Sequence, residues 1–184
     1  MTPPFVSKRP AGEAPWVTFG CDCDTYEKWV PRVCAMACAQ SLILGLKDQS
    51  PSLWELTQEA QTLGVYKTDK ASAPKGAFHH PLAKQLGRHG FAARVFAGSG
   101  VDDLQLFLAA GNVLILSIDL MKLPTPQQGS HLILVYGYSE PANTFFLHDN
   151  ASVIRPHGKA IEITAEELGS LSNGRGLCCR HQTD

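Results

Sequence analysis

The sequence predicts an α+β fold, because helical patterns fill the first half of the chain and strand patterns dominate the second. Apolar residues recur at helical spacing up to Gly90, whereas short apolar runs bounded by turn residues follow from Phe91 onward. The chain has 184 residues, of which 44% are hydrophobic and 18% are charged, and this is the length and composition of one globular domain.

Residues 1–20 are expected to form an extended N-terminal arm, followed by a single domain over residues 21–184. The first sixteen residues carry four prolines and little hydrophobic periodicity. The first clear helix is expected from Cys34 to Leu46, directly after Pro31. This stretch is polar only at Gln40 and Ser41, which predicts a helix buried on most sides.

Two more helices are expected before the strand-rich half. Ser50 is a typical N-cap, Pro51 suits the first helical position, and Gly64 ends the apolar pattern that follows them. Residues 67–77 are small and polar and predict a loop. Residues 81–90 then predict another helix that ends at a glycine.

The second half predicts short strands joined by turns. Helical spacing of apolar residues predicts one helix over residues 101–110, and Thr164 predicts the N-cap of a last helix that buries Leu168 and Leu171. Strands are expected over residues 91–97, 113–118, 131–138, 144–148 and 161–163.

The distribution of charged and apolar residues makes a nucleic-acid partner and a membrane span unexpected. Sixteen basic and seventeen acidic residues give a net charge of -1, and no basic cluster indicates a nucleic-acid surface. The longest apolar run, Val113–Leu116, is too short to cross a bilayer, and residues 1–12 lack the apolar core of a signal peptide. We therefore expect a cytoplasmic protein, of an oligomeric state that the sequence does not predict.

Three residues in the order Cys34, His131 and Asp149 form the candidate catalytic set. A thiol at a helix N-terminus has a lowered pKa and favours the nucleophilic thiolate. His131 begins an apolar strand, and Asp149 ends the next strand along the chain. The three residues therefore suit the roles of nucleophile, base and orienting carboxylate, with Asn150 as an alternative to Asp149.

The other cysteines allow more than one interpretation. Cys38 lies one helical turn beyond Cys34 and is expected in the core. The remaining four are Cys21, Cys23, Cys178 and Cys179. They fit reduced packing cysteines, a redox-sensitive pair or a metal site, although their spacing is not that of a zinc knuckle. For the protein as a whole, we expect neither a metal nor an organic cofactor.

An ordered set of segments resembles the papain-like double-glycine peptidases that trim bacteriocin leaders, and their stand-alone relatives. The segments are a cysteine-led helix start at Cys34–Cys38, an apolar stretch at Leu104–Ile118, a histidine-led strand at 130–138, and a strand ending in aspartate at 146–150. The resemblance covers residues 27–171. It implies a papain-like fold in which the nucleophile helix packs on a C-terminal antiparallel sheet.

Two positions depart from the pattern of that family. The family usually has glycine directly after the nucleophile, where this chain has Ala35. It also usually has glutamine six residues before the cysteine, where its amide helps to bind the oxyanion, and this chain has Lys28 there. Lys28 is therefore the candidate replacement for the oxyanion-binding amide, and Asn150 is a second candidate near the site.

The resemblance implies a cysteine-dependent acyl-transfer enzyme that acts on a peptide or a peptide-like small molecule. Two outcomes for the acyl group stay open, namely hydrolysis by a peptidase or amidase and amide formation by a transferase of peptide natural-product biosynthesis. The alternative from another class is a non-catalytic domain of the same fold that binds a leader peptide. The missing glutamine keeps this alternative open.

Overall fold

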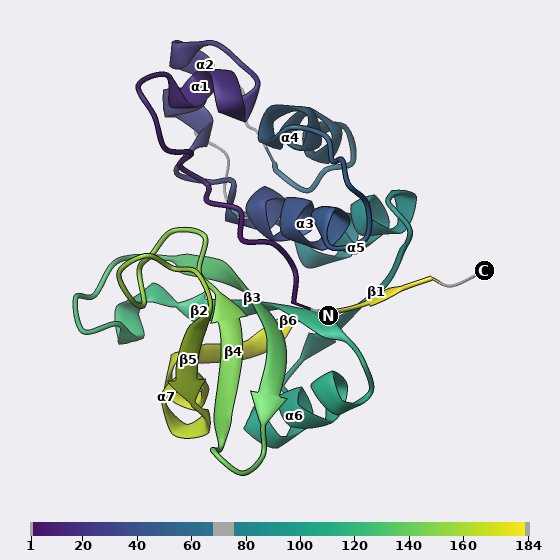
Figure 1. Ribbon diagram of the computed structural model, residues 1–184, viewed down its shortest axis with the longest axis vertical. Coiled ribbons are helices and arrows are strands. Elements are labelled where there is room, and N and C mark those ends of the chain that lie inside the picture. Colours follow the sequence, from purple (N-terminus) through teal and green to yellow (C-terminus); the bar gives the residue numbers. More distant parts are fainter. Residues whose placement is uncertain (1, 68–75, 183–184) are drawn as a thin grey trace.

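The computed structural model describes residues 2–67 and 76–182. Five helices from the first half lie on one face of a six-stranded sheet, and the remaining helices lie toward the other face (Figure 1). The predicted α+β fold is therefore confirmed, including a helical half that packs on an antiparallel sheet.

The helical half surrounds one buried helix, α3 (Cys34–Leu44). Its residues from Ala35 to Ala39 are almost completely removed from solvent, so this helix is held on all sides. Figure 1 shows α3 between the sheet and the outer helices. The other helices of this half are α1 (Pro15–Phe19), α2 (Cys23–Trp29), α4 (Leu53–Thr62) and α5 (His79–Arg88).

The sheet has the strand order β1-β6-β2-β3-β4-β5, and each neighbouring pair is antiparallel. Its last strand in sequence, β6 (Ser172–His181), lies between the first two. The other strands are β1 (Phe91–Ala97), β2 (Val113–Asp119), β3 (Ser130–Ser139), β4 (Thr144–His148) and β5 (Ile161–Thr164). The connections hold α6 (Val101–Ala109), η1 (Leu120–Lys122) and α7 (Ala165–Leu171).

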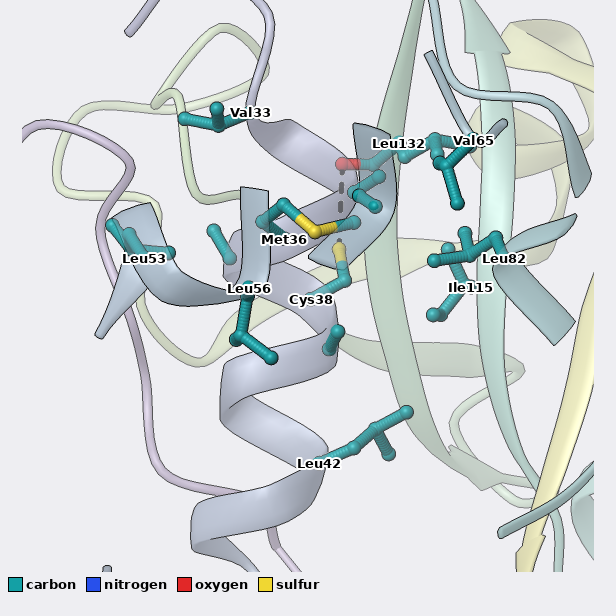
Figure 2. Packing of buried hydrophobic residues seen from close by; sticks show 14 of the residues in the cluster. Val33, Met36, Cys38, Leu42, Leu53, Leu56, Val65, Leu82, Ile115 and Leu132 are labelled. Carbon is teal, nitrogen blue, oxygen red and sulfur yellow. Dashed lines mark hydrogen bonds between the residues drawn. The ribbon is translucent and has the colours of Figure 1, made fainter. Parts of the chain in front are cut away.

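The central strands are apolar on both faces because both faces are covered. Successive side chains of a strand point to opposite sides of the sheet. In β2, Ile115 joins the cluster around α3, whereas Leu114 and Leu116 join the cluster beneath α6 and α7. Figure 2 shows the α3 side of this arrangement, where Met36 and Cys38 lie near Leu132, and Ile115 lies beside Leu82 in the same cluster. This two-sided burial fixes α3 relative to β3.

The N-terminal arm is pinned to the sheet half. The buried His148 ring donates from Nε2 to the Pro3 carbonyl at 2.8 Å and accepts from the Ala160 N–H at 3.0 Å. The Phe5 ring meets the same imidazole edge-on, and the Lys8 N–H donates to the Asn150 carbonyl at 3.0 Å. The arm therefore runs past α3 before it reaches α1 (Figure 1).

Several boundaries differ from the sequence predictions. Residues 15–19 of the expected extended arm form the helix α1, and α2 was also not predicted. The helix α5 begins at His79 rather than at residue 81. The strand β6 was missed because its glycines weaken a strand pattern. Most of the loop expected over residues 67–77 lies outside the described residues.

The cap of α4 is also a correction. The sequence predicts Ser50 as the N-cap, but the structure has Ser52 there, two residues later. The Ser52 hydroxyl accepts from the Glu55 N–H at 3.2 Å, and the Glu55 carboxylate accepts from the Ser52 N–H at 2.7 Å. This reciprocal capping box satisfies two backbone donors of the helix start.

Within residues 2–67 and 76–182, helices are all too short or too polar to cross a membrane.

We expect Ser52→Ala to lower the free energy of unfolding by about 1 kcal/mol, because the variant loses the side-chain acceptor of the cap. Urea denaturation monitored by circular dichroism measures this change. Ser50→Ala is the matched control and should leave stability within about 0.5 kcal/mol of the parent protein. Equal losses in the two variants would contradict the assignment of Ser52 as the cap.

Candidate functional site

Cys34 occupies the first position of α3, where the chain leaves a turn and enters the buried helix. The N-cap residue is Val33, and no side chain caps this helix start. The first backbone N–H groups of α3 are therefore free of side-chain acceptors and point toward the thiol end of the helix. Cys34 is partly exposed, whereas Ala35 and Met36 after it are fully buried. Cys34 thus borders the surface at the start of an otherwise buried helix.

His131 and Asp149 are joined by a hydrogen bond of 2.8 Å between His131 Nε2 and Asp149 Oδ1. His131 is 4% exposed at the start of β3, and Asp149 is completely buried just after β4. The imidazole also interacts with the Cys34 thiol, and this interaction lowers the pKa of the thiol and raises that of the ring. Because Nε2 is engaged by Asp149, Nδ1 is the nitrogen available to the sulfur. The structure therefore brings the three predicted residues together.

Asp149 is held by backbone donors from the loop that follows it. Its Oδ1 accepts from the Ala151 N–H at 3.0 Å, and its Oδ2 accepts from the Ile154 N–H at 2.8 Å. The Asp149 N–H donates to the Gly158 carbonyl at 2.7 Å. A Cβ on Gly158 would overlap the Asp149 carbonyl oxygen, so only glycine permits this approach. The loop fixes the carboxylate that orients His131.

The electrostatics of the site favour a thiolate and an imidazolium. Burial raises the pKa of the Cys34 thiol, but the hydrogen bond and charge of His131 and a backbone hydrogen bond from Leu132 outweigh it. The pKa of Cys34 therefore lies below its ordinary value. Burial lowers the pKa of His131, but hydrogen bonds to Asp149 and Cys34 outweigh this and raise that pKa to about 9.

Asn150 ties α3, the helix that begins with Cys34, to the sheet. Its Nδ2 donates to the Cys34 carbonyl at 3.1 Å and to the Leu132 carbonyl at 3.2 Å, and it lies 3.3 Å from Cys38 Sγ. The side chain is 3% exposed, and its Oδ1 has no hydrogen-bond partner. Asp149, rather than Asn150, accepts from the His131 ring. The Asn150 side chain thus contacts Cys34 through the backbone carbonyl of Cys34.

Lys28 and Lys8 differ in how they relate to the thiol. Lys28 lies in α2 with an exposed side chain. Lys8, on the N-terminal arm, is partly buried beside Asn150, and its charge contributes to the lowered pKa of Cys34. Burial lowers the pKa of Lys8 itself, against the opposing effect of Cys34 and Asp149. Sequence reasoning missed Lys8 because no local pattern links residue 8 to residue 34.

A cleft of about 380 Å³ opens at Cys34. Its walls come from the segment before α5, from the start of α5 itself, and from strands β1, β2, β3 and β6. The lining residues are Cys34, Gly76, Ala77, Phe78, His79, His80, Val95, Ser117, Ser130, Leu132 and Arg175. A substrate in this cleft would therefore lie against the thiol.

The five cysteines other than Cys34 take no part in the interaction between Cys34 and His131. All six cysteines are free. Cys38 is buried, as predicted for a core residue, and donates to the Leu132 carbonyl at 3.6 Å (Figure 2). Burial raises the pKa of Cys38, Cys178 and Cys179. Among the described residues, no group of three or more His, Cys, Asp or Glu side chains could hold a metal.

Comparison with known families gives one match that spans most of the chain. The model of the Peptidase_C39 like family matches residues 22–166. No curated protein sequence matches significantly.

Solved structures share the fold at low sequence identity. A protein assigned as a C39-like peptidase from Bacillus anthracis has a TM-score of 0.62 and 10% identity, covering 98% of this chain and 96% of its own. The peptidase domain of Streptococcus ComA, a bifunctional ABC transporter of a quorum-sensing pathway, has a TM-score of 0.55 and 18% identity over 83% and 93% of the two chains.

A double-glycine motif protease from an AMS/PCAT transporter, solved with its leader peptide, has a TM-score of 0.55 and 14% identity. The match covers 81% of this chain and 84% of the protease.

We expect Cys34 to be alkylated by iodoacetamide far faster than a free thiol at about pH 6, because its pKa is lowered. The rate should change again near pH 9, where His131 loses its proton. Mass spectrometry of the modified peptide measures the rates. Cys179 is the internal control, because burial raises its pKa and it should react slowly. A Cys34 rate that rises only above about pH 8 would contradict this expectation.

We expect Lys8→Met to slow alkylation of Cys34 at about pH 6 by roughly threefold to tenfold, because the thiolate loses a nearby positive charge. Lys8→Arg should retain most of the rate. Lys28→Met is the matched control and should react like the parent protein. A slow Lys28→Met variant with a normal Lys8→Met variant would instead support the prediction made from sequence.

Proposed function

The chain belongs to the Peptidase_C39 like family, and we propose that it is a cysteine-dependent acyl-transfer enzyme with Cys34 as nucleophile. The observation that carries this proposal is the 2.8 Å hydrogen bond between His131 and Asp149, together with the interaction of the same imidazole with the Cys34 thiol. A lowered thiol pKa and a raised imidazole pKa accompany it, as an ion-pair nucleophile requires.

In the first half of the reaction, the Cys34 thiolate attacks the carbonyl carbon of an amide. A C–S bond forms, and the carbonyl oxygen becomes an oxyanion. When the oxyanion collapses, the C–N bond breaks and the His131 imidazolium gives its proton to the leaving amine. Asp149 keeps the His131 ring oriented through Nε2.

In the second half, His131 acts as a base on the acceptor that attacks the acyl-enzyme. Water as acceptor gives a carboxylic acid, and an amine as acceptor gives a new amide. In both cases the C–S bond breaks and the thiolate is regenerated. The walls of the cleft at Cys34 decide which acceptor enters. We propose hydrolysis as the reaction, in keeping with the peptidase family, and transfer to an amine as the variant of the same mechanism.

The oxyanion is proposed to bind at the uncapped N-terminus of α3. The backbone N–H of Cys34 has no side-chain acceptor there and lies next to the sulfur. The glutamine expected six residues earlier is replaced by the exposed Lys28. A single oxyanion donor contributes about two to three orders of magnitude in rate, so this enzyme is expected to be slower than one with both donors.

A peptide is the proposed substrate. The solved double-glycine motif protease is bound to its leader peptide, and it shares the fold of this chain. The cleft at Cys34 offers a volume of about 380 Å³, which accommodates a few residues of an extended peptide. The missing glutamine favours one rival, a domain of this fold that binds a peptide without cleaving it.

We expect Cys34→Ala to abolish turnover of peptide substrates and to remain folded, because alanine is a good helix former and position 34 begins a helix. Liquid chromatography of peptide mixtures, with and without added amines, measures both hydrolysis and transfer. His131→Ala should slow acylation by several orders of magnitude. Peptide binding by the parent protein with slow alkylation of Cys34 would favour the binding domain and contradict the enzyme.

A further inference from the structure

The cleft at Cys34 is a local concentration of basic side chains. Arg175 of β6 and the pair His79 and His80 at the start of α5 line it. Apart from the thiol, each ionisable side chain among the described lining residues is basic. The whole chain has a net charge of -1, so this composition is not a property of the surface at large.

Arg175 has no acidic partner within the part of the chain that the structure describes. The ion pairs found there join other residues, such as Arg88 with Glu59 and Arg155 with Glu167. The Arg175 side chain is exposed in the cleft, so its guanidinium keeps its donors for an incoming group. Arginine binds carboxylates through two parallel N–H bonds.

His79 stands next to this charge as a neutral donor. Burial and the neighbouring Arg175 lower the pKa of His79, so its ring is uncharged near neutral pH and offers one N–H. Phe78 also lines the cleft, and Lys67 Nζ lies 4.9 Å from the centre of its ring. Phe78 is 40% exposed and adds an apolar surface beside these donors. The cleft therefore combines positive charge, hydrogen-bond donors and one aromatic wall.

We propose that this cleft binds a carboxylate of the substrate, with the Arg175 guanidinium as its charged partner and the His79 ring as a second donor. The inference rests on the proposed function, because it names the substrate class of the same site. A substrate carboxylate comes from an acidic side chain or from a free C-terminus, and both have the chemistry that the guanidinium recognises.

Alkylation by two reagents tests the charge of the cleft without any turnover. Iodoacetate carries a carboxylate, whereas iodoacetamide is a neutral reagent of the same size. We expect the iodoacetate rate at Cys34, divided by the iodoacetamide rate, to fall by about twofold to fivefold in Arg175→Gln and further in Arg175→Glu. Arg175→Lys should keep the ratio. Arg180→Gln is the matched control, because Arg180 is exposed on the same strand but lines other pockets.

Protection of Cys34 by peptides then distinguishes the two sources of the carboxylate. An acidic peptide with an amidated C-terminus and a neutral peptide with a free C-terminus are compared with a neutral, amidated peptide. We expect at least one of the first two to slow iodoacetamide alkylation more than the third, and Arg175→Gln to remove the difference.

Three results separate this inference from the proposed function. Fast iodoacetamide alkylation, with equal reagent ratios in the parent protein, Arg175→Gln and Arg180→Gln, would overturn the carboxylate site and leave the enzyme proposal intact. Equal protection by all three peptides would do the same. Slow alkylation of Cys34 by both reagents would instead contradict the proposed function itself.

Discussion

The site depends on the junction between the start of α3 and the start of β3. The buried amide of Asn150 donates to the Cys34 carbonyl and to the Leu132 carbonyl, so one side chain joins α3 to the strand that carries His131. Cys38 adds a contact to the same Leu132 carbonyl from one turn deeper in the helix. Because the interior is close-packed, a small shift of α3 would move the sulfur away from the imidazole.

Local patterns were enough to locate the parts of this junction in the sequence. A proline followed by an apolar run predicted the start of α3 at Cys34, and apolar strands predicted β3 and β4, with His131 at the start of one and Asp149 after the other. These signals work because each depends on neighbouring residues only. The antiparallel pairing of β3 and β4 then places the start of β3 and the end of β4 side by side at the same end of the sheet.

What the sequence could not predict depends on contacts between distant segments. The strand β6 carries two glycines and a polar start, and it becomes a strand because β1 and β2 supply partners on both sides. Ser50 and Ser52 both precede α4, and local helix rules do not distinguish which of them is the N-cap. The close approach of Gly20 to Ser52 is a tertiary contact that such rules do not include. Lys8 reaches the site only because His148 and Asn150 hold the arm.

The N-terminal arm is therefore part of the site rather than an appendage. Asp149 and His131 are nearly inaccessible to solvent, and a buried charge without a partner costs several kcal/mol. In the proposed mechanism, a thiolate at Cys34 adds a second negative group to the Asp149 carboxylate, against one positive group, the His131 imidazolium. The ammonium of Lys8 brings the sum to zero. Lys8 lies before residues 22–166, the segment that the family model matches, so that segment alone does not contain this ammonium.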